Sequence, residues 1–99
     1  MFNLLTTKAQ RTKNCIKTAG NIVSLIEKKR IIEAEELLKE TIRKYPIGNK
    51  KINNNCTILL MQIDDYIQDD TSTSKDDIVG AFWQLRAEYF TEKEIEKLQ

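Results

Sequence analysis

Apolar residues along this chain recur every three or four positions, which is the spacing of one face of an α-helix. The clearest stripe steps by four, three, four and three through Ile52, Cys56, Leu59, Ile63 and Tyr66. The pattern predicts four helices and a short fifth one: the first starts near Lys8, and the others run from Ile31 to Lys44, Asn53 to Asp69, Lys75 to about Phe90, and onward from Thr91.

Polar residues at the ends of these segments support the same boundaries. A capping box places Ser or Thr before a helix and a Glu, Gln or Asp three residues later. Pro46 and Gly48 stop the second helix, because the residue before Pro leaves the α region and Gly accepts the turn that follows. The predicted boxes pair Thr7 with Gln10, Ser74 with Asp77, and Thr91 with Glu94.

The first predicted helix carries an apolar arc wider than contact with one neighbour requires. This arc includes Cys15, Ile16, Ile22 and Ile26, and it indicates packing on two sides, with a bend at Gly20. A chain of 99 residues has room for one modest core. We therefore expect residues 1–99 to form a single all-α domain, an antiparallel bundle of four helices plus a short C-terminal helix.

Two resemblances bear on this expectation. Ala34, Leu38, Thr41 and Pro46 resemble the second helix of a tetratricopeptide repeat, although no second copy follows about 34 residues later. In length and helix count the chain is similar to small antiparallel bundles such as bacteriocin immunity proteins. The first resemblance implies a helical hairpin, and the second implies a small cytosolic protein that binds a protein partner.

Charge is unevenly distributed along the chain. Residues 1–30 carry seven Lys or Arg against one acid, whereas residues 61–99 carry four against ten. The overall charge of +1 therefore conceals a basic end and an acidic end. This polarity indicates either an attraction between the two ends or the recognition of a charged partner.

The residue types argue against an enzyme. Histidine is absent, which removes the commonest general base and metal ligand. Glycines are too scattered for a phosphate loop, and the six aspartates between Asp64 and Asp77 do not fit a calcium loop because Ser74 stands where Gly is required. We expect no catalytic residue, no metal site and no cofactor.

Cys15 and Cys56 are expected to be buried, reduced thiols, which is typical of cysteines in a helical cytoplasmic protein. No apolar run is long enough to span a bilayer, and no signal-peptide core is present. The first 26 residues lack acids, as an organellar transit peptide does, but the cytoplasm is the leading expectation for localisation.

The predicted fourth helix offers a partner-binding surface. Val79, Trp83 and Phe90 form a stripe beside its core-facing residues, interrupted by Arg86. Aromatic residues at this spacing usually belong to the core, so Trp83 is either a core residue, which is the commoner case, or an anchor for a partner. The leading hypothesis is a non-enzymatic module that docks a helical face on another protein or on a second copy of itself; truncating Trp83 or Phe90 would then weaken binding without unfolding the domain.

Two further hypotheses rest on the basic end. A nucleic-acid binder would use its positive charges to displace counterions from phosphates, although no recognition motif accompanies them. Alternatively, the same end would contact an anionic membrane surface without crossing it. The residues concerned are Lys13, Lys17, Lys28, Lys29 and Arg30.

Overall fold

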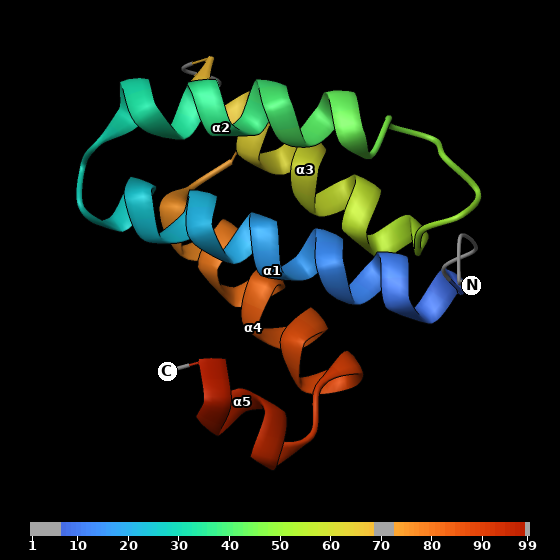
Figure 1. The fold of residues 1–99 in the computed structure, drawn as a ribbon. Helices are drawn as coiled ribbons and strands as arrows, with labels where there is room; N and C mark the ends of the chain where they lie inside the picture. Colours follow the sequence, from blue (N-terminus) through green and yellow to red (C-terminus); the bar gives the residue numbers. More distant parts are fainter. Residues whose placement is uncertain (1–6, 69–72, 99) are drawn as a thin grey trace.

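A computed structural model describes residues 7–68 and 73–98 of the chain, and these residues form five helices without a strand. Figure 1 shows the chain changing direction at each connection from α1 to α4, with α5 returning beneath them. The helices are α1 (Lys8–Glu27), α2 (Ile31–Lys44), α3 (Asn54–Ile67), α4 (Lys75–Tyr89) and α5 (Glu92–Leu98). The all-α prediction is confirmed for the described residues.

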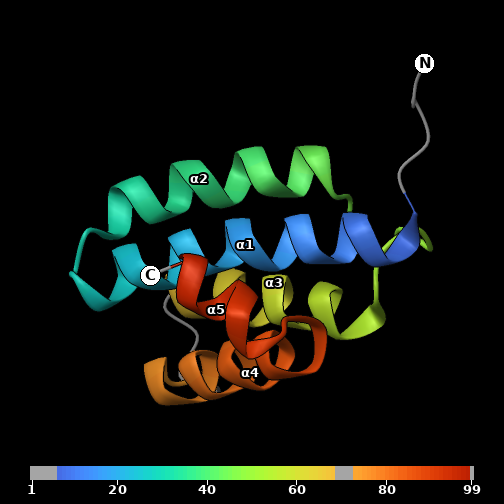
Figure 2. The ribbon, with the colours of Figure 1, turned by 60° about the horizontal axis from the view of Figure 1, so that its bottom comes forward.

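Helix α1 lies at the centre of the fold. It packs against α2, α3 and α4, and Figure 2 shows α2 and α4 on opposite sides of it. The prediction that the first helix is packed on two sides is therefore confirmed. Its wide apolar arc supplies much of a core that also draws on every other long helix; Ile16, Ile22, Leu38, Leu60, Ile63 and Ile78 are among the side chains buried there.

The helix starts follow the capping signals closely. Ser74 and Asp77 form a complete capping box, in which each side chain accepts from the other residue's backbone N–H. Thr7 accepts from the backbone N–H of Gln10 at 3.1 Å. The Gln10 side chain does not reach back as predicted; it donates instead to Asn14 Oδ1 at 3.1 Å, because that residue lies one turn further along the helix.

Asn53 joins three helices at the start of α3. Its side chain caps α3 by accepting from Asn55 N–H, so the helix begins one residue after the predicted start. Its backbone N–H donates to the buried Thr12 hydroxyl of α1 at 3.2 Å, and its amide Nδ2 donates to the Tyr89 hydroxyl of α4 at 2.6 Å. At the other end α3 stops at Ile67; the predicted end, Asp69, lies outside the described residues.

The turn from α1 to α2 has an unusual residue at its bend. Lys29 adopts φ +62°, the left-handed conformation that usually belongs to Gly. Its N–H donates to the Ile26 carbonyl at 3.0 Å, and the Arg30 N–H donates to the Leu25 carbonyl at 2.9 Å. These two bonds form the Schellman motif that closes a helix C-terminus. A strained lysine therefore sits within the basic run that ends α1.

Gly20 allows α4 to approach α1. The predicted role of this residue was a bend, but α1 continues through it as one helix. A Cβ atom placed at Gly20 would lie 2.8 Å from Cζ of Phe82, closer than real Cβ contacts. The missing side chain therefore creates the space into which the Phe82 ring packs.

Candidate interaction surface

A groove of about 410 Å³ runs between α1 and α4. Residues of α1 form one wall and residues of α4 form the other. Its size falls in the range of pockets that hold small ligands or a few side chains of a partner. It is lined by Ile16, Lys17, Gly20, Asn21, Val23, Ser24, Glu27, Phe82, Trp83, Arg86 and Phe90.

Trp83 stands at the rim of this groove with 49% of its surface exposed. The commoner alternative, that it belongs to the core, is wrong, because Phe82, its neighbour in the chain, takes the inward position against Gly20. The two rings contact edge to face, with centroids 5.8 Å apart. The fold thus leaves its single tryptophan accessible to other molecules.

Arg86 is buried beside Trp83, with only 8% of its surface exposed. Its guanidinium carbon lies 4.7 Å from the centroid of the Trp83 ring. Nη2 donates a long hydrogen bond, 3.4 Å, to the Ile95 carbonyl of α5, and Nε is buried without a partner. No carboxylate of the described residues forms an ion pair with it. The sequence suggested only that Arg86 interrupts an apolar stripe; its contact with the α5 backbone is a tertiary contact that the spacing within α4 does not indicate.

The other two residues of the predicted stripe are less accessible than Trp83. Phe90 is buried at the base of the groove, and Val79 is partly buried against the core. Lys13 Nζ lies 5.5 Å from the centroid of the Phe90 ring. Phe90 is therefore part of the core, and its truncation to alanine should destabilise the domain by about 3–5 kcal/mol.

The basic residues do not form one patch. Lys13 pairs with Glu94 of α5 at 2.9 Å, and Arg30 pairs with Glu33 at 2.7 Å. Lys17 lines the groove, whereas Lys28 and Lys29 are exposed in the turn after α1; Lys13 and Lys28 are separated by about 22 Å of helix at 1.5 Å per residue. The Lys13–Glu94 pair is a contact between the basic and acidic ends within one molecule.

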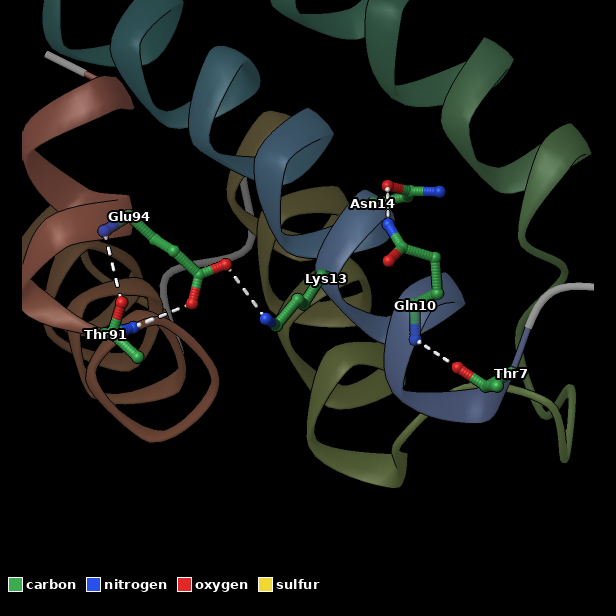
Figure 3. Close-up of polar contacts among 6 residues, drawn as sticks. All are labelled: Thr7, Gln10, Lys13, Asn14, Thr91 and Glu94. Atoms are coloured by element: carbon green, nitrogen blue, oxygen red, sulfur yellow. Dashed lines mark hydrogen bonds and ion pairs between the residues drawn. The ribbon is translucent and has the colours of Figure 1, made fainter.

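Figure 3 shows how α5 presents Glu94 to Lys13. One carboxylate oxygen accepts from Lys13, and the other accepts from the Thr91 N–H at 3.1 Å. The Thr91 hydroxyl accepts from the Glu94 N–H, which completes the predicted capping box. The hydrogen bond from Lys13, followed by that from Thr91, lowers the pKa of the Glu94 carboxyl.

The two cysteines lie together in the core. Cys15 and Cys56 are each 1% exposed, so the prediction of buried thiols is confirmed. A hydrogen bond to the Cys15 thiol, together with burial, raises the pKa of Cys56 strongly. Both thiols are enclosed in the core, where a cysteine packs as a small apolar side chain.

Within residues 7–68 and 73–98, no three His, Cys, Asp or Glu side chains gather as metal ligands would. The predicted acidic cluster includes Asp69 and Asp70, which lie outside this part of the chain. None of the described helices is both long and apolar enough to cross a membrane.

The groove between α1 and α4 therefore brings the exposed Trp83 and the buried Arg86 together on the described surface. Comparison of the whole chain with protein families, with curated proteins and with solved structures finds no match.

Proposed function

We propose that this protein is a non-enzymatic, cytoplasmic interaction module that docks the groove between α1 and α4 on a protein partner. The observation that carries the proposal is the half-exposed Trp83 at the rim of the groove. In this proposal the helices form an antiparallel four-helix bundle closed by α5, as in immunity-type proteins. The bundle holds the two walls of the groove in place for the partner.

Trp83 has the properties of an interface anchor. Tryptophan, tyrosine and arginine dominate binding energy at protein interfaces, and they act best where a surrounding rim excludes water. Phe82 contacts Trp83 edge to face and the Arg86 guanidinium lies over the Trp83 ring, so these two contacts restrict the orientation of the indole before binding. A fixed aromatic anchor loses little conformational entropy when a partner covers it.

The geometry favours a protein partner over nucleic acid. Of the five basic residues that a nucleic-acid site would use, Lys13 and Arg30 already hold carboxylates. The others are divided between Lys17 on α1 and Lys28 and Lys29 in the turn after it. A phosphate backbone needs several free cations on one surface. A second copy of this chain remains a candidate partner, which a measurement of oligomeric state distinguishes from another protein.

The direct test is affinity capture from a lysate of the source organism with tagged protein. We expect a reproducible protein partner with wild type and a loss of at least about tenfold with Trp83→Ala, the cost of removing a hot-spot anchor. Gln84→Ala is the matched control, because Gln84 is the next residue of α4, is exposed and lies outside the groove. Equal capture by wild type and Trp83→Ala would contradict the proposal.

Three parallel measurements identify other partners. Light scattering of the purified protein reports self-association. Gel-shift titration against salt reports nucleic-acid binding through its slope. Flotation with vesicles of phosphatidylcholine alone, or mixed with phosphatidylserine, reports binding to an anionic membrane. If Trp83→Ala still retards nucleic acid in the gel or still floats with the vesicles, binding would be assigned to the basic end of the chain and not to the groove.

A further inference from the structure

We propose that the groove between α1 and α4 recognises a carboxylate, and that the partner supplies it as an Asp or Glu side chain next to an apolar residue. This inference rests on the proposed function and adds the chemistry by which the partner is chosen. Arg86 is the residue that would receive the carboxylate, with Lys17 on the opposite wall.

The first argument is the unsatisfied charge of Arg86. A guanidinium offers five N–H donors, and burying it without an anion is costly. Arg86 is more than nine-tenths buried, yet among the described residues it makes one hydrogen bond of 3.4 Å, and its Nε has no partner. The contact of its guanidinium with the Trp83 ring provides no hydrogen-bond acceptor for the N–H groups, of which Nε–H is left without a partner. Such a group is prepared to accept an anion from outside the chain.

The second argument is the composition of the groove. Lys17, Asn21 and Ser24 follow one another along the α1 wall at intervals of four and three residues, so they share a face of that helix. All three can donate hydrogen bonds. The lining also includes the largely buried apolar side chains of Phe82 and Phe90. A groove lined by both polar and apolar side chains fits a ligand that carries both a charged group and an apolar group.

The third argument concerns the kind of anion. The groove also contains Glu27, which repels a doubly charged phosphate more strongly than a carboxylate. No helix N-terminus and no glycine-rich loop contributes backbone N–H groups to the lining. A planar carboxylate matches the fork of a guanidinium through two parallel hydrogen bonds. One negative charge on a planar group is therefore the best complement.

The test compares small probes on the full chain, using Trp83 fluorescence and amide chemical shifts. The probes are acetyl-Leu-Glu-Leu-amide, its Gln counterpart, 3-phenylpropionate and inorganic phosphate, each up to about 10 mM, near the weak limit of measurable binding. We expect the Glu peptide to bind about tenfold or more tightly than the Gln peptide, the difference expected for hydrogen bonds to a charged group. Chemical shifts should change at residues on both walls of the groove.

Two variants assign the effect to Arg86. Arg86→Gln should abolish the preference for Glu over Gln, and Arg86→Lys should restore only part of it, since an ammonium lacks the bidentate fork. Because Arg86 is an unpaired buried charge, Arg86→Met should raise the unfolding temperature while it abolishes binding of the Glu peptide. A lower unfolding temperature for Arg86→Met would show instead that Arg86 serves to hold α5.

The following outcomes of the peptide titrations and of the capture experiment would overturn the proposal. Equal affinity for the two peptides, or no binding of either, removes the carboxylate assignment. Binding of 3-phenylpropionate without the Glu peptide assigns the groove to a free organic acid, and tighter binding of phosphate assigns it to a phosphorylated ligand. If capture of a protein partner depends on Trp83 but not on Arg86, the docking function stands and the carboxylate inference alone fails.

Discussion

Two helical glycines of this chain differ in the space that surrounds them. Gly20 faces the Phe82 ring, whereas nothing lies within 4 Å of a Cβ placed at Gly80. Glycine in a helix costs about 1 kcal/mol relative to alanine, so a helical glycine is retained only where another interaction outweighs this loss. At Gly20 the compensating interaction is the packing of α4 on α1.

We predict that Gly20→Ala and Gly80→Ala change stability in opposite directions. Overpacking against Phe82 should cost about 1–3 kcal/mol, which exceeds the helix-propensity gain and leaves a net loss of about 1 kcal/mol. Gly80→Ala should gain about 1 kcal/mol because its site is open. Urea unfolding measures both changes, and an increase in stability for Gly20→Ala would show that the ring moves aside at little cost.

Lys29 offers a second test at the residue scale. A φ of +62° costs an L residue about 1–2 kcal/mol of conformational energy, which glycine does not lose. Glycine loses more backbone entropy on folding, so the net gain is roughly half of that energy. Lys29→Gly should therefore raise the free energy of unfolding by about 0.5–1 kcal/mol. Lys28→Gly is the control, because Lys28 has φ −85° and gains nothing from glycine. A loss of stability in both variants would contradict the Schellman assignment.

At the scale of elements, the boundaries of a helix follow from local signals in the sequence. Which other helices it packs against does not. The capping residues Ser74, Thr7 and Thr91 each bond to a residue three positions later in the chain. Because this signal is local, the helix starts could be predicted from the sequence. The exposure of Trp83 and the burial of Arg86 depend on which helix lies opposite and on where α5 returns. Apolar spacing within α4 alone does not contain that information.

The Lys13–Glu94 ion pair links α5 to α1, and this link predicts a pH effect. Because the pKa of Glu94 is lowered in the folded protein, its contribution to stability is present above its ordinary value of 4.5 and is lost as pH falls through the folded value. We expect the protection of the α5 amides, measured against the exchange rate of an unstructured peptide at the same pH, to fall below about pH 4 while α1 stays protected.

Lys13→Met isolates this ion pair, because it removes the charge and leaves the Thr91 capping box in place. The difference in unfolding temperature between wild type and Lys13→Met should be largest near neutral pH. It should shrink as the solution is acidified, since the wild type then loses the same interaction. A difference that does not change with pH would assign the effect of Lys13 to its packing on Phe90.

At the scale of the whole molecule, the separation of charge along the sequence is partly used within the fold. The Lys13–Glu94 pair brings the basic and acidic ends together, and Asp76 and Asp77 lie in the first turn of α4, where negative charge is favourable. The cation that lacks such a partner among the described residues and is also buried is Arg86. In the proposed recognition of a carboxylate, the cation that receives it therefore lies within the acidic end of the sequence.

The central claim is that a partner covers the groove at Trp83, and the single tryptophan reports on this directly. Acrylamide quenching of its fluorescence should be titrated with the protein captured from the lysate, using a partner preparation whose own tryptophans are replaced. We predict that quenching falls as the complex forms and that the emission shifts to shorter wavelength, because a half-exposed indole becomes buried. Unchanged quenching at saturation would show that the partner binds elsewhere on the molecule.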